Sequence, residues 1–262
     1  MADLDSIRHP RRDGDAWAVD VPDGWQQGHG AYGGLAVAAM ISALEADGTD
    51  GKALRSLHAV LCAPVLPGAA TIRTEGLRHG TGTSFREARL LQDGKVQATA
   101  LAVFGKARSP DLDEKTIRMP VVPAANECQV LTLGPPLAPV FTQHFDYRPC
   151  YGNFPFSGSK EARSGAWVQV KRRDGLDGAA LAGLLLDALW PAPSVRMTTP
   201  RPIGTIAFTM QVVDGFADPD APALLVISSD VVHEGYFIEW RDLWGADGRL
   251  IARNQQTIAL IR

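Results

Sequence analysis

A helix that begins with two consecutive glycines is the first feature of this sequence that could do chemistry. Tyr32, Gly33 and Gly34 stand at the start of an apolar run over residues 31–44. The first amides of a helix have no partner within the helix, and its dipole favours negative charge there. Glycine also lets a ligand carbonyl approach closely. These residues predict a binding site for an oxyanion. The alternative is that Gly33 and Gly34 only permit tight packing of helix on sheet.

A second group of polar residues surrounds the segment RHGTGTSFR. Arg78 and Ser84 are its candidate ligand-binding residues. Guanidinium and hydroxyl groups can hydrogen-bond a phosphate or an amide of a ligand. An ordinary polar hairpin rim has the same composition, and this alternative remains open.

Sequence motifs of several common chemistries are absent. The chain has no G-x-S-x-G elbow, no H-E-x-x-H motif and no G-x-x-x-x-G-K-[ST] phosphate loop. Its three cysteines, Cys62, Cys128 and Cys150, form no C-x-x-C pair. We therefore expect no metal and no cofactor.

Composition limits the class of protein and its partners. Of 262 residues, 45% are hydrophobic and 21% charged, which is enough apolar material for a folded core. A formal net charge of -3 without a basic block argues against nucleic acid. Three unpaired cysteines and short, interrupted apolar runs predict a cytoplasmic protein without a membrane span. The polar first 15 residues are expected to be disordered.

Two similar hairpins indicate an internal repeat. They span residues 84–98 and 236–252, and each contains an Asp-Gly pair, which is typical of a tight hairpin turn. Aligning the two gives three matched pairs: Phe85 with Phe237, Glu87 with Glu239, and Arg89 with Arg241.

The segments around the hairpins repeat as well. Each half reads as an apolar helix (31–44 and 179–190), a strand (56–62 and 204–213), a further strand, the hairpin and a last strand. A helix that is apolar on nearly all faces must be buried. The pattern predicts an α+β protein of two fused hot-dog domains, each a sheet wrapped around a helix. We place them at residues 1–107 and 140–262, joined by a Pro-rich linker over 108–139.

The order of these motifs resembles the double hot-dog acyl-CoA thioesterases of the thioesterase II type. The matching stretches include AYGGLAVAAM, SLHAVLCAPVLPG and EGLRHGTGTSFREARLLQDGK in the first half, and GTIAFTMQVV and DGRLIARNQQTIALIR in the second. The resemblance implies a hydrolase of fatty acid metabolism that acts on an acyl-CoA substrate, binds its thioester carbonyl at the helix start near Gly33, and forms a homo-oligomer.

The resemblance also implies three residues that hold and activate a water. They are an Asp early in the strand after the second helix, a Ser or Thr on the next strand, and a Gln on the last strand. Gln256 matches the Gln, and Gln255 should face the other side of its strand. The Asp position falls on Ala207, and the Ser or Thr position on Ser229 or Asp230.

An alanine at position 207 leaves two classes of function open. The first is a thioesterase in which Asp230 or His58 replaces the missing carboxylate. The second is a non-catalytic acyl-CoA or acyl-carrier binding protein. The surroundings of Gln256 distinguish them: a thioesterase requires a carboxylate or imidazole within about one water of its side chain, whereas a binding protein requires none.

Overall fold

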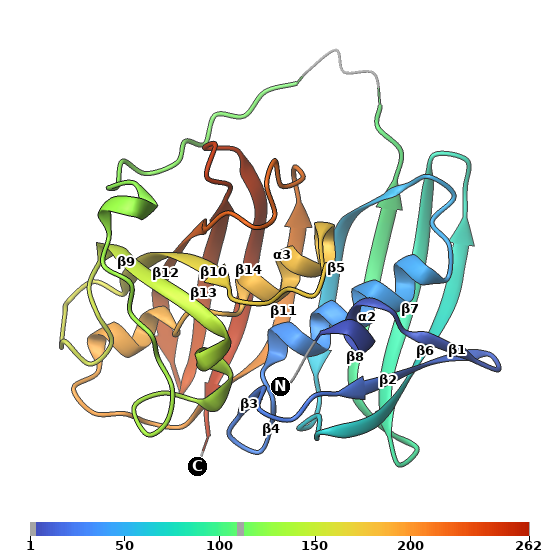
Figure 1. Ribbon diagram of the computed structural model, residues 1–262, viewed down its shortest axis with the longest axis horizontal. Helices are drawn as coiled ribbons and strands as arrows, with labels where there is room; N and C mark the ends of the chain where they lie inside the picture. The colour runs from blue at the N-terminus through green and yellow to red at the C-terminus, as the bar shows by residue number, and fades with distance from the viewer. Residues whose placement is uncertain (1–3, 109–112, 262) are drawn as a thin grey trace.

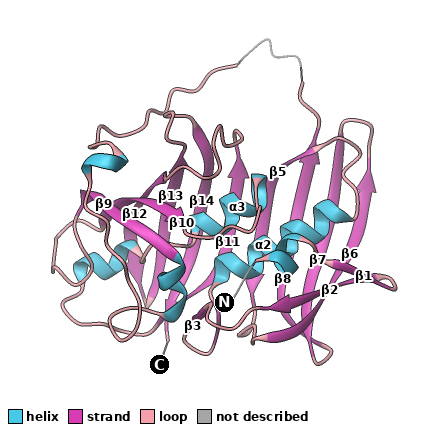
Figure 2. Cartoon of the chain, in the orientation of Figure 1, coloured by secondary structure: helices cyan, strands magenta, loops and turns pink. Residues whose placement is uncertain are grey.

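The computed structural model describes residues 4–108 and 113–261. Of the expected linker, residues 109–112 lie outside the described part, as do residues 1–3 and Arg262. Within the described residues, a 12-stranded antiparallel sheet curves around the helices α2 and α3 (Figures 1 and 2). No helix among these residues has the length and apolarity needed to cross a membrane.

The first half of the chain supplies one side of the sheet. Its elements are α1 (Asp5–Arg8), β1 (Arg11–Asp13), β2 (Ala16–Val21), β3 (Gln26–Gln27), β4 (Gly30–Ala31), α2 (Gly33–Ala46), β5 (Ala53–Leu61), β6 (Gly68–His79), β7 (Thr83–Gln92) and β8 (Lys95–Gly105). The strands β3 and β4 form a separate small ribbon just before α2.

The second half supplies the other side. Its elements are β9 (Phe145–Gly152), β10 (Arg163–Val170), α3 (Gly178–Leu186), β11 (Ile203–Val212), β12 (Ala223–His233), β13 (Tyr236–Trp244) and β14 (Leu250–Leu260), with short 3-10 helices at Ala125–Glu127, Val140–His144 and Ala192–Arg196. Between the halves, the segment after residue 112 packs on the second one, where Trp167 Nε1 donates to the carbonyl of Pro123 at 2.9 Å.

The halves join through one pair of strands. The strand order is β1-β2-β6-β7-β8-β5-β11-β14-β13-β12-β10-β9, so β5 and β11 meet at the centre. Their ladder runs from Ala207 opposite Val60 to Gln211 opposite Ser56. Each half places its long strands in the same order around its helix, which is the predicted double hot-dog arrangement.

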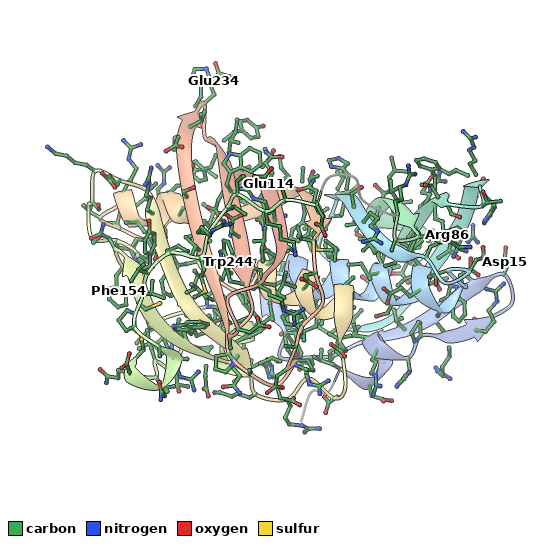
Figure 3. The ribbon with its side chains drawn as sticks, turned by 90° about the horizontal axis from the view of Figure 1, so that it is seen from above. Asp15, Arg86, Glu114, Phe154, Glu234 and Trp244 are labelled. Carbon is green, nitrogen blue, oxygen red and sulfur yellow. The ribbon has the colours of Figure 1, made fainter. Side chains whose placement is uncertain are left out.

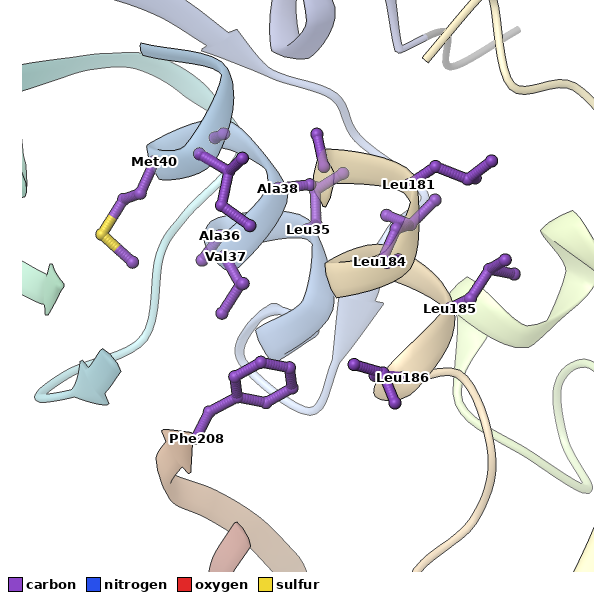
Figure 4. Close-up of a cluster of buried hydrophobic side chains, with 14 of the residues drawn as sticks. Leu35, Ala36, Val37, Ala38, Met40, Leu181, Leu184, Leu185, Leu186 and Phe208 are labelled. Atoms are coloured by element: carbon purple, nitrogen blue, oxygen red, sulfur yellow. The ribbon is translucent and has the colours of Figure 1, made fainter. Parts of the chain in front are cut away.

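The two helices pack on each other inside the sheet. Residues 34–44 of α2 are all buried, as are residues 180–186 of α3. In Figure 4, Leu35 and Val37 of α2 lie near Leu184 of α3, with Phe208 of the sheet beneath. Gly183 brings the two backbones close, since a Cβ there would lie 3.0 Å from Val37 Cγ1.

Residues 4–15, the described part of the N-terminal segment, contradict the expectation of disorder. Leu4 and Ile7 are fully buried in the main core. The amide of Leu4 also donates to Asp174 Oδ2 at 2.8 Å, which attaches the segment to the second half. Its polar composition concealed two apolar anchors, Leu4 just before the short helix α1 and Ile7 within it.

The hairpin alignment from the sequence is also wrong in register. Phe85 and Arg89 are exposed on the outer face of the sheet, whereas Phe237 and Arg241 are buried on the inner face. Side chains alternate along a strand, so an alignment displaced by any odd number of residues exchanges the faces. The inward arginine of β7 is Arg86, which contacts the end of α2 as Arg241 contacts the end of α3.

Candidate active site

One buried carboxylate gathers polar groups from both halves of the chain. Asp187 follows α3 directly and is 6% exposed. Its Oδ2 accepts from the Gly34 amide at 2.8 Å, and its Oδ1 accepts from Gln256 Nε2 at 3.0 Å. Thr205 also hydrogen-bonds this carboxylate, and its Oγ1 lies 2.9 Å from Gln256 Oε1. Since a threonine hydroxyl carries a single proton, it can donate to only one of these acceptors at a time.

The start of α2 is shaped to receive this carboxylate. A Cβ on Gly33 would lie 2.8 Å from Asp187 Oδ2, and one on Gly34 would lie 2.9 Å from the Leu184 carbonyl oxygen. Only glycine therefore lets the end of α3 approach the first turn of α2. The positive end of the α2 dipole then faces the negative carboxylate.

A bulge in β11 turns Thr205 toward the site. Phe208 and Met210 are buried on the inner face, and strict alternation would place Thr205 on the outer face with Ala207. The pairing with β14 shifts between Thr205 and Ala207, which leaves Ile206 unpaired. The extra residue reverses the alternation, as β-bulges do.

Gln256 reaches the same site by regular pairing. It stands opposite Phe208 in the ladder, shares the inner face with it and is fully buried. Gln255 stands opposite Thr209 and is half-buried. The expected difference between these two neighbours is therefore confirmed.

The surroundings of Asp187 act on its pKa in opposite directions. Burial raises the pKa of the carboxyl, whereas the charge of Arg241 and the hydrogen bonds from Gln256, Gly34 and Thr205 lower it. The neighbouring phenol of Tyr32 has a pKa well above its usual value, because of burial and the nearby Asp187. Tyr32 donates to the Leu184 carbonyl at 3.0 Å and thus helps to hold the end of α3.

Two residues expected to replace the missing carboxylate lie elsewhere. His58 is exposed on the outer face, where its Nδ1 lies 2.7 Å from Thr209 Oγ1. Asp230 is exposed near the end of β12. Among the described residues, the hydrogen bonds of the Gln256 side chain go only to Asp187 and Thr205.

The remaining candidates from the sequence are dispersed. Ser229 is buried on β12, with its Oγ 2.8 Å from the Ile238 carbonyl oxygen. Arg78 is exposed on β6. Ser84 is buried on β7, next to Arg86, which binds the carboxyl end of α2. That end lies opposite to Gly33, so the structure brings only Tyr32, Gly33, Gly34 and Gln256 of the predicted residues together.

The assignment of the carboxylate to Ala207 requires correction. Ala207 stands next to the inward Phe208 and belongs to the outer face, so no side chain at this position would point at Gln256. The carboxylate beside Gln256 is Asp187, which the sequence analysis missed together with Thr205. Only one local signal pointed to Asp187: an acidic residue within an otherwise apolar run just before Pro191.

The described part of the chain has no group of three or more His, Cys, Asp and Glu side chains that could hold a metal ion. The polar groups that meet at Asp187 are a carboxylate, an amide, a hydroxyl and a backbone N–H. Such a set can hold a water and accept a proton from it.

Comparisons with known proteins agree with this architecture. Solved structures with the same fold include a hot-dog protein of unknown function from Alicyclobacillus acidocaldarius, with a TM-score of 0.86 at 24% identity over 99% of this chain and 98% of the other. The tesB protein of Mycobacterium avium subs paratuberculosis has a TM-score of 0.80 at 16% identity, with 99% and 98% covered. An acyl-CoA thioesterase II, TesB2, from Mycobacterium marinum has a TM-score of 0.77 at 14% identity, with 98% of each chain covered.

Family models match both halves of the sequence. The acyl-CoA thioesterase N-terminal domain matches residues 21–105, and the acyl-CoA thioesterase C-terminal domain matches residues 121–260. A comparison with curated proteins gave no match. The two domain matches, in order and over most of the sequence, show that this chain belongs to the acyl-CoA thioesterase family.

Proposed function

We propose that this protein hydrolyses acyl-CoA thioesters to the free acid and CoA with a water activated by Asp187. The observation that carries the proposal is the hydrogen bond of 3.0 Å between Gln256 Nε2 and Asp187 Oδ1. It satisfies the criterion derived from the sequence, a titratable base within reach of Gln256. The corrected position of Ala207 removes the reason for preferring a binding protein.

The thioester carbonyl is proposed to bind at the start of α2. The amides of Tyr32, Gly34 and Leu35 are already bonded, to the Trp25 carbonyl, to Asp187 and to the Tyr32 carbonyl respectively. The half-buried Gly33 amide has no hydrogen-bond partner among the described residues. Its N–H is therefore our candidate donor to the carbonyl oxygen, and the helix dipole would favour the negative charge that develops there.

The water would then be held by Asp187, Thr205 and Gln256. As the water oxygen bonds to the carbonyl carbon, Asp187 accepts the proton, and the carbonyl oxygen becomes the oxyanion. When the tetrahedral intermediate collapses, the carbon–sulfur bond breaks and the CoA thiolate takes the proton from Asp187. Thr205 is only half-buried, so substrate and water would enter from its side of the site.

The proposal also includes the compartment, the metabolic role and the oligomeric state of the protein. We infer a cytoplasmic hydrolase of fatty acid metabolism that works as a homo-oligomer. Three free thiols support a reducing compartment. Large apolar residues exposed on the outer face, including Trp240 at 49%, support a contact between copies.

The test is thioester cleavage with two variants of adjacent glutamines. Wild type, Gln256→Ala and Gln255→Ala are assayed with acyl-CoA substrates from short to long chains by loss of the thioester absorbance. We expect turnover that falls at least about tenfold in Gln256→Ala, or roughly 1.4 kcal/mol of barrier, and changes little in Gln255→Ala. Tight binding of an acyl-CoA by the wild type without any turnover would instead identify a binding protein.

A further inference from the structure

A fully buried ion pair lies directly behind the proposed base. Glu239 and Arg241 on β13 are 0% and 1% exposed, and Arg241 Nε donates to Glu239 Oε1 at 2.6 Å. Arg241 Nη1 lies 3.9 Å from Asp187 Oδ1. The arginine is thus too far for a direct hydrogen bond to Asp187 but near enough to act on it by charge.

The pair also attaches the chain on both sides of Asp187. Arg241 Nη1 donates to the carbonyls of Leu186 at 2.7 Å and Leu189 at 3.3 Å. Glu239 Oε2 accepts from the amide of Ala192 at 2.6 Å. The bond to Leu186 takes up a carbonyl that α3 leaves unpaired where it ends. The bonds to Leu189 and Ala192 hold the chain that follows Asp187, so together they fix where Asp187 points.

Few other ionisable groups face Asp187 among the described residues. Glu239 on β13 pairs with Arg241, and its negative charge and that of Asp187 repel each other. Tyr32 precedes α2, and Tyr147 on β9 donates to the Ala188 carbonyl at 2.9 Å. Burial holds the pKa of both phenols above their usual range, so both stay neutral. Arg241 is therefore the one cation at this carboxylate in the part of the chain that the structure describes.

The first half has an aspartate and an arginine in the same arrangement at the end of its helix, but the candidate active site is not there. Asp47 follows α2 as Asp187 follows α3, and Arg86 on β7 donates to the Leu44 carbonyl at 3.0 Å and pairs with Asp47 (Figure 3 labels Arg86). The Asp47 side chain is 22% exposed, whereas that of Asp187 is 4% exposed. An arginine at the helix end is thus common to both halves, but only Arg241 acts on a carboxylate removed from water.

We propose that Arg241, held by Glu239, is a positioning residue that keeps Asp187 ionised and directed between Gly34 and Gln256. This role rests on the proposed function, in which Asp187 accepts a proton. A buried carboxylate without a nearby cation would hold its own proton at higher pH. The enzyme would then lose activity on the acid side.

The main test is the double variant Glu239→Gln/Arg241→Gln, which removes both members of the buried pair together and takes the cation away from Asp187. We expect the acid limb of its kcat/KM profile to move to higher pH by about one unit or more. Arg241→Lys keeps the cation, and its limb should stay near that of wild type. Arg86→Gln is the matched control at the other helix end, and its limb should not move.

A readout independent of activity separates this inference from the proposed function. The carboxyl carbon signal of Asp187, assigned with Asp187→Asn, is titrated by NMR in the same variants. It should titrate at higher pH only in the double variant. If the double variant has a lower kcat but an unchanged Asp187 titration and an unchanged acid limb of kcat/KM, Arg241 is merely structural and the inference fails. A wild type that cleaves no acyl-CoA overturns the proposed function, and the carboxyl titration still decides the role of Arg241.

Discussion

Asp187 Oδ2 accepts a hydrogen bond from the Gly34 amide at 2.8 Å, across 153 residues of sequence. The proposed base therefore comes from the second half, and the amide that orients it comes from the first. Thr205 on β11 and Gln256 on β14 add contacts from the two strands of the second half that lie nearest the junction with the first. Neither half contains the whole site, which accounts for the close packing of α2 on α3.

The contact between the helices predicts strong sensitivity at Gly34. In Gly34→Ala, the new Cβ would meet the Leu184 carbonyl oxygen at 2.9 Å and Tyr32 Cε2 at 2.7 Å. Overpacking of about 1–3 kcal/mol should outweigh the helix gain of roughly 1 kcal/mol from alanine. We expect lower thermal stability and at least about tenfold lower activity, since about 1.4 kcal/mol of barrier is tenfold in rate. Gly82→Ala, where a Cβ meets nothing within 4 Å, is the control, and an equal loss there would contradict this reasoning.

Asp187→Asn should nearly abolish hydrolysis and leave the fold intact. An asparagine fills the same space but cannot take the proton of the water. General-base catalysis typically contributes about 10²–10⁴-fold, and we expect kcat to fall by this range. Arg241 keeps Glu239 as its partner, so no buried charge is left unpaired. Thermal unfolding and acyl-CoA binding are measured alongside. A variant that retains more than about a third of the wild-type rate would exclude Asp187 as the base.

Thr205 tests whether a hydroxyl is needed next to the base. Thr205→Val preserves shape and strand preference but removes the donor, whereas Thr205→Ser preserves the donor. Hydrogen bonds to charged groups contribute about 1.5–3 kcal/mol, so valine should reduce kcat/KM by roughly 10–100-fold. Serine should stay within a few-fold of wild type. Equal rates for valine and serine would show that the hydroxyl does not hold the water.

The sequence predicted the fold because its local signals are strong. Two apolar helices, strands of alternating pattern and the Asp-Gly turns all have short-range causes, and Asp93 and Gly94 do adopt positive φ. Gln256 could be placed because its strand is regular. Asp187 could not be placed in the site, because the apolar pattern continues to residue 190 and predicts that Asp187 lies within the helix. In the structure α3 ends at Leu186, where Arg241 takes up the carbonyls.

Thr205 was missed for a different physical reason. Counting alternate residues along β11 from Phe208 assigns Thr205 to the outer face, and only the bulge at Ile206 reverses this. A bulge depends on pairing with β14, which no local pattern reveals. The shifted hairpin alignment arose in the same way, because side-chain direction follows from register and not from residue type alone.

Two sequence-based candidates whose side chains are exposed, His58 and Asp230, should be dispensable for hydrolysis. His58 and Asp230 are exposed and make no contact with Gln256. We expect His58→Ala and Asp230→Asn to keep kcat/KM within about twofold of wild type, as for surface substitutions worth roughly 0.5 kcal/mol or less. Both are assayed beside Asp187→Asn with the same acyl-CoA. A large loss in either would mean that a sequence-based candidate acts in a conformation other than this one.

The pH dependence of the wild type follows from the burial of Asp187. The reaction needs the ionised carboxylate, so kcat/KM should rise with pH through the pKa of Asp187 in the free enzyme. Burial raises this pKa from its ordinary value, while Arg241 and three hydrogen bonds oppose the rise. The acid limb should therefore lie above the pH at which an exposed aspartate titrates, about 3.9. Rate profiles in buffers of constant ionic strength measure it, with acid unfolding followed in parallel. A limb at or below the ordinary aspartate range, in protein that remains folded, would show that the titrating group is not this buried carboxyl.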